Sequence, residues 1–169
     1  MLYLFQNAPM QTTAAPSKVA TNATIKTLLQ LAVKSGVQAK IKEWGFSGDA
    51  SAAAAPGVVE LIETDVAATV TAAVTNDITR IDGSALNLGD PLTALINAGV
   101  SATGYTATVE GTITAVRNLD GSQLIAPTSQ YNKQFPLGEE PVLQAGKFLR
   151  IRVTFPATVN GLVYVKFEI

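Results

Sequence analysis

Two segments near the end of the chain alternate apolar and polar residues. They are FLRIRVTF, which ends at Phe155, and LVYVKFEI, which begins at Leu162. A repeat of two is the side-chain period of a β-strand with one buried and one solvated face. Asn160-Gly161 lies between the two segments, and this dipeptide between alternating runs is typical of a tight β-hairpin turn. The pattern predicts that the two strands pair with each other.

A third alternating segment, residues 37–46 (VQAKIKEWGF), changes phase within its length. Ala39 and Ile41 fall on one face, but Glu43 stands where the next apolar residue is due, and Trp44 is apolar instead. One extra residue in a strand produces such a shift. We therefore predict a β-bulge or a change of sheet near Glu43.

The other strand candidates are rich in β-branched and aromatic residues and are bordered by turn-forming residues. Residues 65–79 also match helical spacing, but their threonines are costly in a helix, so strand and loop are predicted there. Residues 47–57 are predicted as a loop and Leu92 to Ala98 as one short helix. The predicted strands are 25–33, 37–46, 58–64, 105–116, 124–126, 131–135, 147–155 and 162–169.

About eight strands with turns at this spacing predict two packed antiparallel sheets. The predicted fold class is all-β: a single jelly-roll-like antiparallel β-sandwich domain at residues 25–169, a size that fits one core. The alternative is an immunoglobulin-like sandwich, although its Cys-Trp-Cys pattern is missing because the chain has no cysteine.

The first 24 residues lack this periodicity. Residues 6–24 contain Pro9 and Pro16, which is typical of an extended segment. We predict an extended N-terminal arm at residues 1–24, and a frayed terminus is the alternative. Its tip is a cluster of large apolar side chains that would be unfavourable in water, so these are the predicted partner-binding residues: Leu2, Tyr3, Leu4 and Phe5.

Composition removes several classes of function. The formal charge of −1 supplies no field that would concentrate the protein on nucleic acid or an anionic membrane. Without cysteine or histidine the chain has no disulfide, no thiolate metal site and no Ser-His or Cys-His pair. We predict no enzyme activity, no catalytic, cofactor-binding or metal-binding residues, and no cofactor. The N-terminus lacks the basic flank of a secretory signal, and no apolar run reaches the roughly 18–20 residues of a transmembrane helix.

Three groups of residues have side chains that could serve other chemistry. Trp44, the only tryptophan, is predicted to be a core anchor rather than a sugar-stacking platform, because the tyrosines are scattered along the sequence. Glu139 and Glu140 are neighbours, and neighbours on an extended chain point to opposite faces, so a solvated turn is predicted rather than a glycosidase pair. The acidic and amide residues of 76–90 match no EF-hand spacing and are predicted to form Asx turns. They are Asn76, Asp77, Asp82, Asn87 and Asp90.

Two stretches resemble a known group of proteins. The first is Lys42-Glu43-Trp44-Gly45-Phe46, a small-residue loop and Val59-Glu60-Leu61. The second is YNKQFPLGEEP from Tyr131 to Pro141, followed by a strand pair that ends YVKFE at Glu168. In order and spacing they are similar to tailed-bacteriophage capsid decoration (cement, or minor capsid) proteins, over about residues 25–169.

The resemblance implies a jelly-roll or similar sandwich that forms trimers on the outer capsid surface and has no catalytic site. The expected function is a structural virion protein, made in the bacterial host cytoplasm, that stabilises the assembled shell. The expected partners are the major capsid protein and further copies of itself in a homotrimer, without nucleic acid or membrane. The alternative is a phage fibre or receptor module that binds glycans with the same sandwich.

Overall fold

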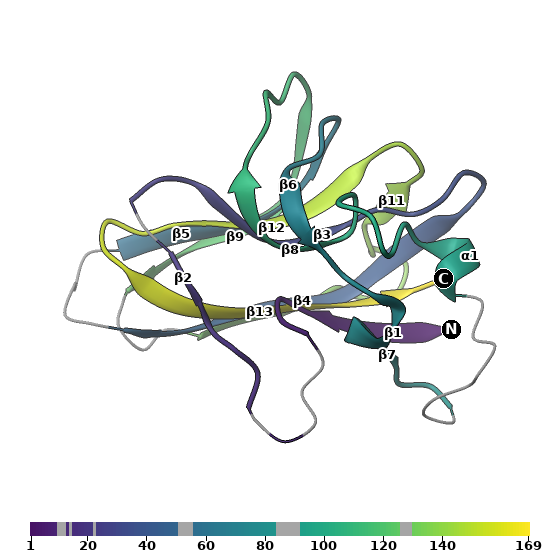
Figure 1. The fold of residues 1–169 in the computed structure, drawn as a ribbon, viewed down its shortest axis with the longest axis horizontal. Coiled ribbons are helices and arrows are strands. Elements are labelled where there is room, and N and C mark those ends of the chain that lie inside the picture. The colour runs from purple at the N-terminus through teal and green to yellow at the C-terminus, as the bar shows by residue number, and fades with distance from the viewer. Residues whose placement is uncertain (10–12, 14, 22, 51–55, 84–91, 126–129) are drawn as a thin grey trace.

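The computed structural model describes residues 1–9, 13, 15–21, 23–50, 56–83, 92–125 and 130–169. In these residues two antiparallel β-sheets pack face to face, with the two chain ends side by side at one end of the sandwich (Figure 1). This arrangement confirms the predicted all-β sandwich. A jelly-roll path of the chain stays a prediction.

The strands divide between the two sheets as follows. Sheet A contains β1 (Leu2–Gln6), β2 (Val19–Ala20), β4 (Gln38–Ala50), β7 (Ile78–Arg80), β10 (Gln130–Gln134), β11 (Val142–Gln144) and β13 (Val159–Glu168). Sheet B contains β3 (Lys26–Leu31), β5 (Pro56–Thr64), β6 (Thr69–Ala72), β8 (Gly104–Val109), β9 (Val116–Ile125) and β12 (Phe148–Thr154). The order in sheet A is β10-β4-β13-β1-β7, with β11 beside β4 and β2 beside β13, and the order in sheet B is β6-β8-β3-β12-β5-β9. Two short helical turns, η1 (Thr75–Asp77) and α1 (Leu92–Leu95), connect strands, so the predicted helix forms only one turn.

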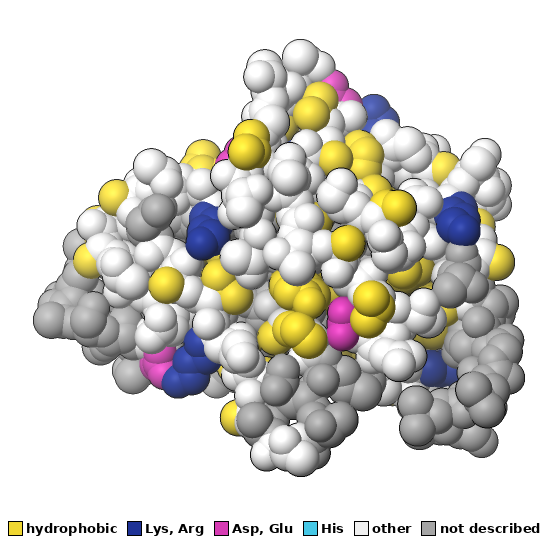
Figure 2. All heavy atoms as spheres, in the orientation of Figure 1, with side chains coloured by type: hydrophobic (Ala, Val, Ile, Leu, Met, Phe, Trp, Pro, Cys, Tyr) yellow, Lys and Arg dark blue, Asp and Glu magenta, His cyan; other side chains and the backbone are white. Residues whose placement is uncertain are grey.

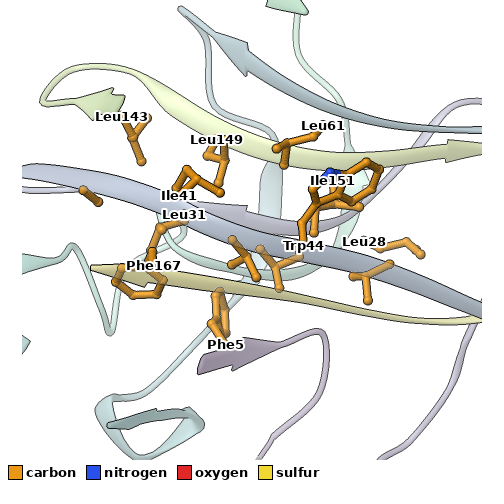
Figure 3. Packing of buried hydrophobic residues seen from close by; sticks show 14 of the residues in the cluster. Phe5, Leu28, Leu31, Ile41, Trp44, Leu61, Leu143, Leu149, Ile151 and Phe167 are labelled. Carbon is orange, nitrogen blue, oxygen red and sulfur yellow. The ribbon is translucent and has the colours of Figure 1, made fainter. Parts of the chain in front are cut away.

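The core lies between the inward faces of the two sheets. Trp44 and Ile41 of β4 meet Leu61 of β5 and Ile151 of β12 there, and each is fully buried (Figure 3). The prediction that Trp44 is a core anchor is confirmed. Burying one large apolar side chain contributes about 1.5–3 kcal/mol, so this layer is the main source of stability.

The predicted bulge in β4 is confirmed. The pairing of β4 with β13 shifts register between Lys166 and Phe167, which face Glu43 and Ile41. Lys42 is the extra residue. The shift lets Lys42 and Glu43 both reach the outer surface of sheet A, while Ile41 and Trp44 on either side of them stay in the core.

The predicted hairpin at Asn160 and Gly161 is wrong. β12 pairs with strands of sheet B and β13 with strands of sheet A, so the chain crosses from one sheet to the other after the buried Phe155. Asn160 and Gly161 lie inside β13. A Cβ atom on Gly161 would lie 2.9 Å from the Phe46 ring and 3.0 Å from a Leu28 methyl group. The glycine therefore permits close packing and makes no turn.

The prediction of an N-terminal arm that starts at residue 1 is also wrong. β1 is an interior strand, paired with β13 on one side and β7 on the other. Tyr3 and Phe5 are fully buried, and the Tyr3 ring stacks on Phe167 at 5.5 Å. The pattern did not predict this strand, because its five residues are too few to establish a period and its partner strand β13 lies more than 150 residues away in the sequence.

The described residues that follow β1 also attach to β13. The buried Asn7 side chain donates to the Gly161 carbonyl at 3.1 Å and accepts from the Val163 N–H at 3.0 Å. The Thr21 hydroxyl donates to the Val159 carbonyl at 3.0 Å. Buried polar groups that are hydrogen-bonded in this way hold a segment in place.

Other strands also differ from their predicted bounds. β8 ends at Val109, whereas the predicted strand runs to residue 116. β9 begins at Val116, eight residues before the predicted strand, and Gly121 lies inside it. The short strand β11 was not predicted. The predicted loop 47–57 is in part strand, because β4 extends to Ala50 and β5 begins at Pro56, and residues 51–55 lie outside the described residues.

β6 and β8 form one edge of sheet B (Figure 1), and this edge with the segments beside it makes a flap over the Gln30 side chain of β3. The fully buried Gln30 side chain holds this flap, because its amide donates to the carbonyls of Ala68, Ser101 and Ala102 and its oxygen accepts from the Ala68 N–H. On the outer face of sheet A, the outward side chains of β13 are half-buried or exposed and alternate with buried core side chains.

Candidate partner-binding surface

Ion pairs connect the strands on the outer face of sheet A. Lys166 of β13 lies 2.8 Å from Glu43 of the neighbouring strand β4. Lys42, the bulged residue, lies 2.9 Å from Glu140 and 2.8 Å from Glu168. These two lysines and three glutamates leave one net negative charge, a weak field for a charged partner.

Tyr164 extends this network. Its hydroxyl donates a hydrogen bond to a Glu43 carboxylate oxygen, and Lys166 Nζ lies 5.6 Å from the centre of its ring. Burial first, and then the hydrogen bond to Glu43, raise the pKa of Tyr164 above its usual value. Burial would raise the pKa of Glu43, but the hydrogen bonds from Lys166 and Tyr164 bring it below its usual value. The tyrosine side chain is thus fixed on the sheet surface.

The turn between β10 and β11 presents the most exposed large apolar side chain of the described residues. Leu137 at its tip is 92% exposed. The Glu139 N–H donates to the Pro136 carbonyl at 3.0 Å, and Gly138 has φ +91°. A positive φ at the third residue of the turn defines a type II turn, which favours glycine there. The type II turn that the local sequence favours therefore directs the Leu137 side chain into solvent.

Glu140 clamps this turn to the sheet. One carboxylate oxygen accepts from the Gly138 N–H at 2.8 Å and the other binds Lys42 at 2.9 Å. The hydrogen bond from Lys42 is the main reason that the pKa of Glu140 falls to about 2. On either side of the turn, the Phe135 N–H donates to the Lys42 carbonyl and the Ile41 N–H donates to the Pro141 carbonyl, both at 2.9 Å. These bonds to β4 hold the turn rigid at both of its ends.

Acid should loosen this turn in a pH range set by Glu140. A carboxylate whose pKa is lower in the folded state contributes stability above its unfolded value, here 4.5, and loses it as the pH falls to about 2. We expect the Gly138 amide resonance to titrate in NMR spectra with a midpoint near 2, and the titration to disappear in Glu140→Gln. A midpoint at the ordinary value of 4.5 would show that Glu140 does not clamp the turn.

The four predicted partner-binding residues divide between the two faces of sheet A. Leu2 and Leu4 are half-buried on the outer face, where they pair in register with Glu168 and Lys166. Tyr3 and Phe5 point into the core and are closed to a partner. Binding through Leu2 and Leu4 stays a prediction.

The other candidate groups lie apart from one another. Tyr131 packs inward on Trp44 at 5.2 Å while Tyr164 lies on the outer face of sheet A, so these two tyrosines share no surface. Glu139 is exposed, whereas Glu140 is bound within its own chain. Asp77 accepts from the Val74 N–H at 2.9 Å, three residues back, as in a capping box and unlike the predicted Asx turn, whose bond reaches two residues on. Asn87 and Asp90 lie outside the described residues.

Leu137 was not among the predicted site residues. The sequence did place Pro136-Leu137-Gly138 in a turn, and a large apolar side chain at the second position of a type II turn points to solvent. The signal was therefore present in the sequence. What the sequence could not give is the anchoring by Glu140, whose partner Lys42 lies 98 residues away.

No group of three or more acidic, histidine or cysteine side chains in the described part of the chain is placed to hold a metal ion. Among the same residues, no helix has the length and hydropathy required to cross a membrane. No family model matches this chain, and no curated protein or solved structure matches it either.

Proposed function

We propose that this chain is a structural virion protein of a tailed bacteriophage, a decoration or cement protein that binds the outer surface of the assembled capsid. In this proposal it is made in the host cytoplasm, binds the major capsid protein as a homotrimer and performs no catalysis. The observation that carries the proposal is Leu137, fully exposed on a turn that the fold holds rigid. The turn lies in the Tyr131–Pro141 stretch that resembles such proteins.

An exposed leucine on a rigid turn suits protein binding for two physical reasons. Moving its side chain from water into an apolar pocket yields about 1.5–3 kcal/mol. A turn that is already ordered loses little conformational entropy when it docks, so more of that gain is available for affinity. A trimer would present three such turns, and linked contacts reinforce one another through effective concentration.

The surface charge supports a largely uncharged contact. Figure 2 shows one face of the molecule, on which Lys, Arg, Asp and Glu side chains are few. On sheet A, Lys42 binds Glu140 and Glu168, and Lys166 binds Glu43. Binding that uses little net charge depends weakly on salt, because few counterions are released.

Stabilisation of the shell follows from selective binding. A protein that binds only the assembled capsid shifts the equilibrium toward assembly by RT ln(1 + [L]/Kd), about 4 kcal/mol at a thousandfold excess over Kd. The proposal therefore needs no chemical step.

The proposal predicts that Leu137→Asp abolishes capsid binding. A buried, unpaired carboxylate in an apolar pocket costs several kcal/mol, so occupancy should fall about 100-fold or more. The measurement is co-sedimentation with undecorated capsids of the phage that carries the gene. Because Leu137 has no part in the core, the urea midpoint should not change. The matched control is Val116→Asp, which alters another exposed apolar residue and should bind normally.

Two results would contradict the proposal. One is wild-type occupancy by Leu137→Asp, which would remove the turn from the contact. The other is a wild-type chain that does not bind capsids, whether as the free protein or as trimers on the shell, which light scattering would detect.

A further inference from the structure

A small pocket lies on the outer face of sheet A, where β1, β4, β10 and β13 run side by side. Its volume is about 120 Å³. Strand register places its outward side chains in two adjacent rows: Asn132, Tyr164 and Gln6, in register with Gly45, in one, and Gln130, Ser47 and Leu162 in the other. The pocket is thus built by four strands of one sheet and not by a loop.

Gly45 creates the space in which two of these side chains lie. A Cβ atom at this position would be 2.4 Å from Asn132 Oδ1 and 2.5 Å from Tyr164 Cε1. The amide of Asn132 and the ring of Tyr164 therefore both lean over the bare backbone of β4. Since Glu43 accepts the hydrogen bond of the Tyr164 hydroxyl, the ring is held in place before any ligand arrives.

The lining selects a neutral, hydroxylated ligand. Three carboxamides, from Gln6, Gln130 and Asn132, and the Ser47 hydroxyl are exposed, and each can both donate and accept hydrogen bonds. Tyr164 adds an aromatic surface. No lining residue carries a formal charge, which gives neither an anion nor a cation a counter-charge in the pocket.

We propose that this pocket binds a neutral glycan through one terminal hexose or N-acetylhexosamine unit. Vicinal hydroxyl groups match the paired donors and acceptors of carboxamides, and the apolar C–H groups of a sugar ring can pack on an aromatic side chain. The pocket is smaller than the roughly 300–1,000 Å³ of a drug-sized site, so it takes one end of a glycan and binds it weakly. The site is independent of Leu137 and of capsid binding.

The test begins with an array of neutral and sialylated glycans probed with the full chain. Binding to neutral glycans is the expected result, and binding to sialylated glycans alone, or to none, would overturn the proposal. The neutral disaccharide that gives the strongest signal is then titrated to about 20 mM against the 15N-labelled protein, a range that detects millimolar Kd values. We expect the backbone amides of Ser47, Asn132 and Tyr164 to shift, and shifts confined to other strands would overturn the assigned site.

Variants give the second arm of the test. Asn132→Ala and Gln6→Ala should each weaken the Kd by about tenfold, because each removes one amide from the lining. The control is Gln123→Ala, an exposed amide on β9 of the other sheet, which should bind as the wild type does. Equal affinities for all three variants would overturn the proposal. Capsid co-sedimentation by the same variants should remain normal, which separates this site from the proposed structural function.

Discussion

Phe5→Ala is expected to lower the free energy of unfolding by about 3–5 kcal/mol, the usual cost of removing a buried phenylalanine ring. Phe5 is fully buried, and it lies on a strand that is paired on both sides. An arm outside the domain would predict no change. The measurement is urea unfolding followed by the fluorescence of Trp44, the only tryptophan.

The matched control for Phe5 is its neighbour Leu4. Leu4 lies on the same strand but points outward and is half-buried, so Leu4→Ala should cost roughly 1 kcal/mol. Equal effects of the two substitutions would contradict the assignment of β1 as a core strand. For the same reason, removing residues 1–24 should unfold the sandwich and should not yield a folded domain that merely lacks an arm.

Asp120→Ala is expected to destabilise the protein by about 2–4 kcal/mol. Asp120 on β9 of sheet B accepts the Trp44 indole N–H at 2.9 Å and the Tyr131 hydroxyl at 2.8 Å, and both donors belong to sheet A. Leaving a buried donor without a partner costs about 1–3 kcal/mol, and this substitution affects two donors. Burial, together with the bond to Asp120, raises the pKa of Tyr131 to about 12, as expected for a hydroxyl that donates to a carboxylate.

Two variants separate the parts of the Asp120 contact. Asp120→Asn keeps an acceptor oxygen and should lose less stability than Asp120→Ala, while Tyr131→Phe removes one donor and leaves the other bond intact. The readout is the urea midpoint together with the emission maximum of Trp44. An Asp120→Ala protein within about 0.5 kcal/mol of the wild type would show that this carboxylate does not join the sheets.

The local pattern predicted the class of fold but not which strands pair. The phase change at Glu43 correctly indicated a bulge because side-chain alternation is a local property of one strand. The Asn-Gly signal at 160–161 failed because a small residue is also selected by close packing, here against Phe46. Strand pairing depends on partners far away in the sequence, and the side-chain alternation within one strand does not identify those partners.

The solvent exposure of β9 and the short length of β1 were the second source of error. β9 reads as a polar turn because most of its side chains face solvent at the edge of sheet B, so it has little apolar alternation. β1 reads as a stray apolar cluster because its five residues are too few to establish a period. The exposed leucine of the β10–β11 turn is the reverse case, since its turn was predicted and only its rigid anchoring depends on distant contacts.

Cryo-EM of intact particles of the phage that carries the gene tests the central proposal most directly. We expect density for the sandwich on the outer capsid surface, in groups of three, with the Leu137 turn seated in an apolar pocket of the major capsid protein. Particles that lack the chain, or a bound chain whose Leu137 turn points to solvent, would contradict the proposal.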